Sequence, residues 1–117
     1  ENIMVNGNKE DIEHILSTLI DNAIKHTESG NDVIVELSKE KNELIIQVKN
    51  EGKEIPEKER EKIFERFYRI DKSRNRNEKS YGLGLAIAKS TVKKYNGNIK
   101  VLYKDGFTIF KVNLQIQ

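Results

Sequence analysis

A polar flank on a predicted helix contains the first residues that could do chemistry. Thr18, Asn22, Lys25 and His26 follow one another at i, i+4, i+7 and i+8. At about 100° per residue, this spacing places them together on one side of a helix, where the core meets solvent. An amide, an ammonium and an imidazole in that position can form one wall of a polar ligand pocket. An amide oxygen can also complete a Mg²⁺ shell that is shared with phosphates and waters.

A pair of glycines provides a second possible anion site. Gly82-Leu83-Gly84 opens the last predicted helix, where glycines let backbone N–H groups approach an anion and the helix dipole favours negative charge. The segment just before it, 69–81, contains five basic residues and almost no apolar ones. It predicts a mobile loop that could fold over a polyphosphate. Each feature also has a plain structural explanation: surface residues on the helix, a tight turn at the glycines, and a solvated charged loop.

The composition restricts the classes of protein and site that remain. The chain has 117 residues, of which 36% are hydrophobic and 34% charged, and this suits one domain with one core. Its net charge of +2 gives no field that would favour nucleic acid. The absence of cysteine excludes disulfides, thiolate chemistry and cysteine metal sites, and two histidines without a carboxylate cluster do not make the usual metal site. No apolar run reaches the ~20 residues that a membrane span needs.

The first half of the chain predicts one helix and three strands. A helix is predicted over 12–27, with Asn8 as its N-cap, because seven apolar residues form one stripe. The stripe consists of Ile12, Ile15, Leu16, Leu19, Ile20, Ala23 and Ile24. A short strand precedes it at 3–5, and two more follow at 32–38 and 44–49. Because no helix fits between these last two, we expect them to pair antiparallel. One face of the strand at 32–38 carries Val33, Val35 and Leu37.

The second half predicts two helices and two strands. Pro56 suits the first turn of a short helix, which carries the apolar residues Ile63, Phe64 and Phe67. The last helix is predicted over 82–95 and ends at Asn96-Gly97 as a left-handed cap. Alternating strands follow at 99–103 and 110–116. This order predicts an α+β fold: a two-layer α/β sandwich with a mixed, mostly antiparallel sheet and three helices on one face.

Four segments resemble the sequence boxes of two-component sensor histidine kinases. Residues 19–27 (LIDNAIKHT) resemble the N box and 48–56 (VKNEGKEIP) the first glycine box. Residues 64–69 (FERFYR) are similar to the F box, and 82–87 (GLGLAI) to the second glycine box. Each motif is weak alone, but their order and spacing are specific and cover the chain from about Asp11 to its end. The resemblance implies the ATP-binding domain that these kinases share with the gyrase, heat-shock chaperone and mismatch-repair ATPases.

The resemblance implies a set of contacts to Mg²⁺ and the phosphates. Asn22 would coordinate Mg²⁺ through its side-chain oxygen, Lys25 would contact phosphate, and His26 would line the phosphate or ribose side. Arg69 and Arg74 match arginines that reach the phosphates, and Asn22, Lys25 and Arg69 would be the catalytic residues. Backbone N–H groups would reach the phosphates at two glycines, Gly82 and Gly84.

A second set of contacts would hold the base. Asn50 stands where the family usually has the aspartate that accepts from the adenine amino group. Its amide oxygen can still accept, but without charge, so the hydrogen bond is weaker. Gly52 would let the backbone close on the base, and Ile55 and Leu83 would border it. Further departures from the family pattern are Thr18 for an asparagine, Glu54 for a glycine, and Ser80-Tyr81 where lid glycines are common.

The resemblance leads to a specific expectation for residues 1–117: a single ATP-binding catalytic domain of a sensor histidine kinase, without the dimerisation domain. It would bind Mg·ATP and donate the γ-phosphoryl group to a histidine on that separate domain, with a response regulator downstream. Alone it would be monomeric and would not autophosphorylate, because neither His14 nor His26 is followed by the phosphoacceptor pattern. The family implies a cytoplasmic domain of a membrane-anchored parent.

Two alternatives remain open from the sequence. One is a nucleotide-insensitive protein-interaction module that keeps the fold, which the departures at Asn50 and Glu54 support. The other is a serine-directed relative such as an anti-sigma-factor kinase, which the long F-box and lid segment disfavours. Calorimetry with Mg·ATP distinguishes the kinase from the interaction module.

Overall fold

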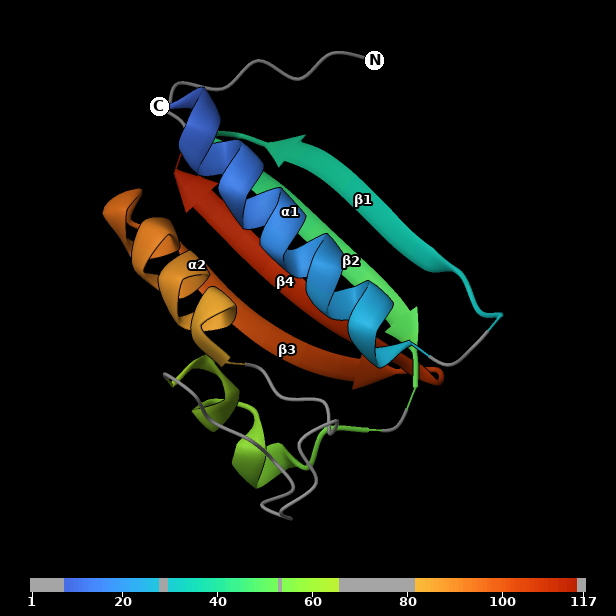
Figure 1. Ribbon diagram of the computed structural model, residues 1–117. Coiled ribbons are helices and arrows are strands. Elements are labelled where there is room, and N and C mark those ends of the chain that lie inside the picture. Colours follow the sequence, from blue (N-terminus) through green and yellow to red (C-terminus); the bar gives the residue numbers. More distant parts are fainter. Residues whose placement is uncertain (1–7, 28–29, 53, 66–81, 116–117) are drawn as a thin grey trace.

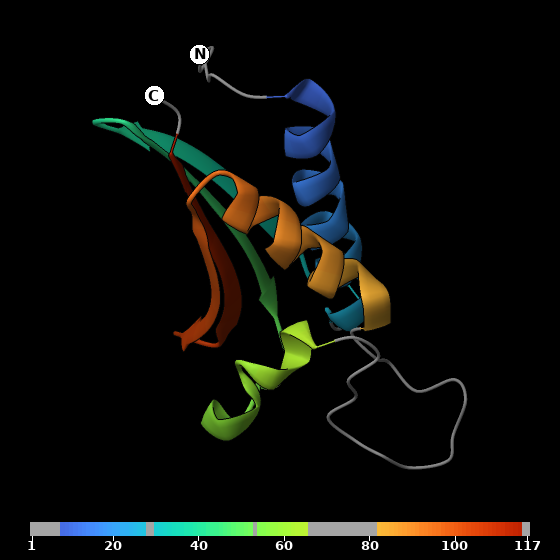
Figure 2. The same ribbon diagram turned by 90° about the vertical axis from the view of Figure 1, so that its left-hand side faces the viewer.

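A layer of helices lies on one face of a four-stranded sheet (Figure 1). The computed structural model describes residues 8–27, 30–52, 54–65 and 82–115. The elements are α1 (Lys9–His26), β1 (Val33–Glu40), β2 (Glu43–Glu51), the 3₁₀ helices η1 (Glu57–Glu59) and η2 (Lys62–Phe64), α2 (Gly82–Lys94), β3 (Asn98–Lys104) and β4 (Phe107–Gln115). Figure 2 shows the two layers from the side. The predicted α+β two-layer sandwich is confirmed.

The strand order of the sheet is β1-β2-β4-β3. All three pairings among these strands are antiparallel, so the described part of the sheet contains no parallel pair. The predicted hairpin of β1 and β2 is confirmed, with a left-handed residue, Lys41 at φ 53°, in its turn. The predicted strand at 3–5 lies outside the described residues.

The core lies between α1, α2 and the inner strands β2 and β4. Every second residue of these two strands is buried on the helix-facing side, as the alternation predicts. From the sheet these include Ile46, Val48, Phe110, Val112 and Leu114. From α1 they are Ile15, Leu19 and Ala23, all fully buried. Asn8 caps α1 as predicted, because its Oδ1 accepts from the backbone N–H groups of Glu10 and Asp11 at 2.7 and 3.3 Å.

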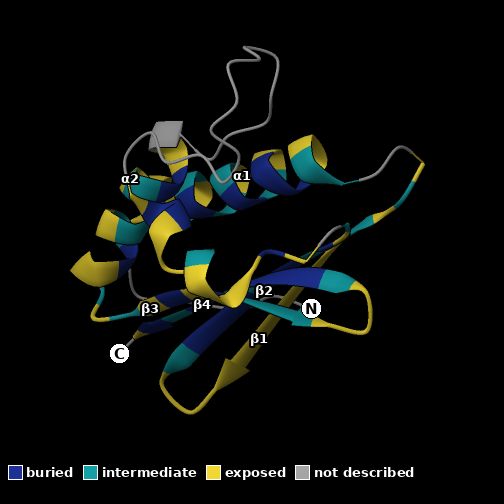
Figure 3. Cartoon of the chain, turned by 90° about the horizontal axis from the view of Figure 1, so that it is seen from below, coloured by how far each residue is buried: buried dark blue, intermediate teal, exposed yellow. Residues whose placement is uncertain are grey.

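One edge of the apolar stripe is exposed, contrary to the prediction. Ile24 is 59% exposed, although it belongs to the predicted core-facing stripe of α1. Val35 and Leu37 on β1 are also exposed, at 41% and 47%, although they oppose the buried Val48 and Ile46 on the helix-facing side. The exposure follows from position, because α1 packs mainly on β2 and β1 is the edge strand of the sheet (Figures 1 and 3).

The predicted short helix after Pro56 forms two 3₁₀ helices instead of one α-helix. Glu59 N–H bonds to Pro56 C=O at 2.8 Å, which is the tighter i→i+3 pattern typical of short pieces. The second of them buries Ile63 and Phe64, as predicted, and Phe64 meets Phe110 edge-on with ring centroids 6.2 Å apart. Phe67 lies outside the described residues.

The two α-helices run antiparallel, and contacts at both ends of α2 establish this. Lys94 and Tyr95, at the end of α2, both donate to Asp11 in the first turn of α1, at 2.8 and 2.9 Å. At the start of α2, a Cβ placed on Gly84 would lie 3.5 Å from the methyl carbon of Thr18, which is at the middle of α1. The carboxyl-terminal half of α1 therefore lies beside the start of α2.

The end of α2 confirms the predicted cap. Asn96 is left-handed, with φ 55°, and the N–H of Gly97 bonds back to Val92 C=O at 3.1 Å. A side chain is excluded at Gly97, because a Cβ there would collide with the carbonyl oxygen of Asn113 on β4. This close approach joins α2 to the sheet.

Candidate nucleotide site

One end of the sheet presents a row of polar side chains to the helix layer. Asn50 on β2 lies directly opposite Thr108 on β4, which in turn opposes Tyr103 on β3. Asn50 is 2% exposed and Thr108 5%. The Oδ1 of Asn50 is buried without a hydrogen-bond partner, and its Nδ2 donates only a long bond, 3.5 Å, to Glu51 C=O. A buried acceptor without a partner costs stability, so it indicates a place for a ligand donor.

The end of α1 is joined to this row through Glu51 and Gly52, where β2 ends and the following loop begins. The Thr27 hydroxyl donates to Glu51 C=O at 3.3 Å, and the Tyr103 hydroxyl donates to Gly52 C=O at 3.4 Å. A Cβ on Gly52 would lie 3.3 Å from the His26 carbonyl oxygen and 3.4 Å from Asn50 Nδ2. Three predicted site residues, His26, Asn50 and Gly52, are therefore brought together, and a side chain at position 52 would press on the His26 carbonyl oxygen.

Asn22 lies one helical turn after Thr18, on the flank of α1 that faces the start of α2. It is 9% exposed, and its Nδ2 is buried without a partner. Lys25 is exposed on the same flank, and His26 is half-buried. Thr18 is the member of this flank that lies beside Gly84, and the grouping of the other side chains there stays a prediction.

The donors present fit a Mg²⁺ ion that is bound together with a nucleotide. The described residues contain no group of three or more His, Cys, Asp or Glu side chains that could hold a metal. A single amide ligand such as Asn22 suits Mg²⁺ only when phosphates and waters supply the remaining oxygens, which is the usual manner of Mg²⁺ in phosphate sites.

The other predicted site residues fall into three groups. Ile55 is buried, at 5% exposure, close to the end of β2. Gly82 and Leu83 are the first two residues of α2, and the side chain of Leu83 is outside the described part of the chain. Arg69 and Arg74, together with the predicted mobile loop at 69–81, also lie outside it.

Two features of the site were not found by sequence reasoning. Thr108 and Tyr103 belong to the polar row only because of the pairing register, which alternation within one strand does not reveal. Glu54 forms an ion pair with Arg60 at 2.8 Å, and Arg60 also donates to Ile55 C=O at 2.9 Å. Glu54 thus contacts the same arginine that bonds to the backbone of Ile55.

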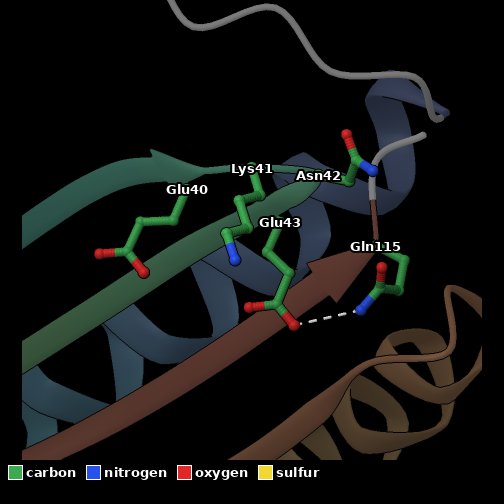
Figure 4. A pocket seen from close by; sticks show the side chains of 5 residues that line it. All are labelled: Glu40, Lys41, Asn42, Glu43 and Gln115. Atoms are coloured by element: carbon green, nitrogen blue, oxygen red, sulfur yellow. Dashed lines mark hydrogen bonds between the residues drawn. The ribbon is translucent and has the colours of Figure 1, made fainter.

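A hollow at the opposite end of the sheet is a weaker candidate. It has a volume of about 640 Å³ and is lined by Glu40, Lys41, Asn42, Glu43 and Gln115 (Figure 4). Glu43 accepts from Gln115 Nε2 at 3.1 Å and from Asn113 Nδ2 at 3.2 Å. Its lining is mainly the exposed hairpin turn between β1 and β2, and its Glu43 carboxylate is already bonded within the sheet.

Comparison with known proteins decides the family. The profile of the "Histidine kinase-, DNA gyrase B-, and HSP90-like ATPase" family matches residues 7–117. The chain belongs to this family. Its relatives include the sensor histidine kinase WalK of Bacillus subtilis, 41% identical over 83% of this chain and 16% of WalK. The probable sensor histidine kinase TcrY of Mycobacterium tuberculosis is 37% identical over 99% of this chain and 24% of TcrY. The chain thus spans a quarter or less of these relatives.

Solved structures agree with the family. The mycobacterial sensor histidine kinase MprB matches with a TM-score of 0.82 and 29% identity, over 95% of this chain and 74% of the MprB chain. The histidine kinase ThkA, solved in complex with the response regulator TrrA, matches with a TM-score of 0.83 over the whole chain and 32% of ThkA. At 23% identity, ThkA supports the fold alone. The resemblance to sensor histidine kinases is therefore confirmed as a family relationship. No helix in the described segments has the length and apolar character needed to cross a bilayer.

Proposed function

We propose that this chain binds Mg·ATP between the carboxyl-terminal half of α1 and the start of α2, and presents the γ-phosphoryl group to a histidine on a separate helical domain. The observation that carries the proposal is the buried, unpartnered Oδ1 of Asn50 beside Gly52. An amino group of a purine base would satisfy this acceptor. Membership of an ATPase family and kinship with sensor kinases support the same ligand.

The roles at the phosphate end follow from side-chain chemistry. Asn22 would give its amide oxygen to Mg²⁺, and Lys25 would contact a phosphate as a cation. Gly82 and Gly84 would bring backbone N–H groups to the phosphates at the amino-terminal end of α2. Arg69 and Arg74, which lie outside the described residues, would add positive charge near the phosphates. Mg²⁺ would offset the charge that develops on the phosphoryl oxygens during transfer.

The acceptor histidine would come from another domain of the parent protein. His14 on α1 is a poor acceptor, because its Nε2 is buried and the side chain is only partly accessible. We therefore expect the chain alone to bind ATP without labelling its own histidines. ThkA was solved in complex with a response regulator, and we propose a response regulator as the downstream partner of the parent here too.

Calorimetry with Mg·ATP tests the proposal. Binding in the micromolar to millimolar range is expected, with at least about a tenfold loss in Asn22→Ala, equivalent to about 1.4 kcal/mol. Asn98→Ala is the matched control, because Asn98 is exposed on β3. If the wild-type chain gives no heat in this range, the proposal fails and the nucleotide-insensitive interaction module becomes the better description.

A further inference from the structure

The side-chain amide of Asn50 has two nearly isosteric ends, and neither is held by a strong hydrogen bond. Its Oδ1 has no partner, and its Nδ2 lies 3.5 Å from Glu51 C=O, at the outer limit for a hydrogen bond. Turning the amide over therefore loses one long contact and exchanges an acceptor for a donor at the same place. The backbone need not move, because β2 is paired on both sides, with Val33 and Thr108 as the direct neighbours of Asn50.

Among the described residues of the polar row, no charged group selects one orientation of the Asn50 amide. Thr108 and Tyr103, which continue the row across the sheet, end in hydroxyl groups, and a hydroxyl both donates and accepts. Gly52 adds no side chain between this row and His26. Neither a carboxylate nor an ammonium group therefore belongs to the row that would meet the base.

Purine bases differ in whether the group on carbon 6 donates or accepts a hydrogen bond. A 6-amino purine presents a donor there, and a 6-oxo purine presents an acceptor. A carboxylate can only accept a hydrogen bond, so it disfavours a 6-oxo purine. An amide can donate or accept, so it can bond to a 6-amino or a 6-oxo purine. On the basis of the proposed function, we propose that this nucleotide site takes both 6-amino and 6-oxo purine nucleoside triphosphates, with Asn50 turning to suit the base.

Calorimetry with Mg·ATP and Mg·ITP tests this inference on the 117-residue chain. The two bases differ at carbon 6 and in the proton on the adjacent ring nitrogen, and ITP lacks the extra 2-amino group of GTP. We expect the two dissociation constants to agree within about tenfold. If ATP binds and ITP is weaker by more than this factor, the inference is wrong and the proposed function stands. If neither binds, the proposed function itself fails.

Two substitutions test whether Asn50 is responsible. Asn50→Asp removes the donor end and is expected to shift the ratio of the two affinities towards ATP by at least about tenfold. An unchanged ratio in a folded variant would overturn the inference. Asn50→Leu keeps the shape and avoids a buried charge, so it serves if the aspartate variant does not fold. It is expected to weaken both nucleotides, and a loss for ATP alone would show that Asn50 acts only as an acceptor.

Discussion

Asp11 and Lys94 form an ion pair of 2.8 Å that joins the first turn of α1 to the last turn of α2. The two residues are 83 positions apart in sequence, and the Tyr95 hydroxyl donates to the same carboxylate oxygen. The hydroxyl of Tyr95 also accepts from the backbone N–H of Asn8, the cap of α1. This cluster fixes the antiparallel alignment of the helices, on which the predicted grouping of Asn22 with Gly84 depends.

The ion pair predicts a pH-dependent stability. Hydrogen bonds from Lys94 and Tyr95 lower the pKa of Asp11 below its ordinary 3.8. The carboxylate therefore stabilises the fold above pH 3.8, and this contribution is lost as pH falls through the lower folded-state pKa. Asp11→Asn is expected to lower the melting temperature at neutral pH, with a gap to wild type that closes in acid. Glu13→Gln, at an exposed position of α1, is the control.

The contribution of the Asp11–Lys94 ion pair to stability is also lost at high pH. The hydrogen bond to Asp11 raises the pKa of Lys94 above 10.5, so its contribution is complete below 10.5 and is lost as pH rises through the higher folded-state pKa. Thermal melts across both ranges check the two signs. A gap between Asp11→Asn and wild type that is constant from neutral to acid pH would show that the charge of Asp11 is not its cause.

Phe64 is expected to be a main anchor of the segment after β2. It is 6% exposed, meets Phe110 edge-on, and lies under the Lys89 ammonium at 5.8 Å from the ring centroid. Phe64→Ala should cost about 3 kcal/mol of unfolding free energy, measured by urea denaturation. Ile24→Ala, on the exposed edge of α1, should cost less than about 0.5 kcal/mol. Similar costs for both would mean that Phe64 is not packed as described.

Gly97 is expected to tolerate no side chain. A Cβ there would collide with the carbonyl oxygen of Asn113 and press on Val92, so Gly97→Ala should cost about 2 kcal/mol or more. Gly84→Ala is the matched comparison, because its Cβ would make only an ordinary contact with Thr18. Since alanine favours helix over glycine, Gly84→Ala should leave unfolding free energy unchanged or raise it by up to about 1 kcal/mol. Equal destabilisation of the two variants would contradict this.

Removal of Mg²⁺ is expected to weaken nucleotide binding through Asn22. At a free Mg·ATP concentration of about 100 times its Kd, ligand binding should raise the unfolding free energy by about 2.7 kcal/mol. With EDTA present, we expect most of this gain to disappear. In Asn22→Ala the gain should be small and the same with or without EDTA. A full response of the variant to Mg²⁺ would assign the metal to other residues.

Much of the fold follows from local pattern. The stripe over 12–27 and the alternation at 44–49 predict their elements because one face of each is buried continuously. The insertion of β4 between β2 and β3 depends on contacts far apart in sequence, which no local period encodes. The exposure of Ile24 has the same origin, since it depends on where β1 ends up relative to α1.

The candidate site divides in a similar way. Asn22, Lys25 and His26 could be grouped from sequence because they share one helix, whose period sets their directions. Thr108 could not be joined to Asn50, because their proximity follows from the register of two strands separated by more than fifty residues. The ion pair of Glu54 with Arg60 depends on the 3₁₀ turns, which the sequence did not distinguish from one short α-helix.

The position of Asn50 on an interior strand has a consequence for inhibitor chemistry. Hydrogen-bonded neighbours on both sides hold this part of β2 in place before any compound arrives. A small heterocycle that offers a donor to Oδ1 would meet a preformed surface and spend little of its binding energy on ordering the protein. Fragment screening is therefore best started from flat, phosphate-free heterocycles directed at this end of the sheet.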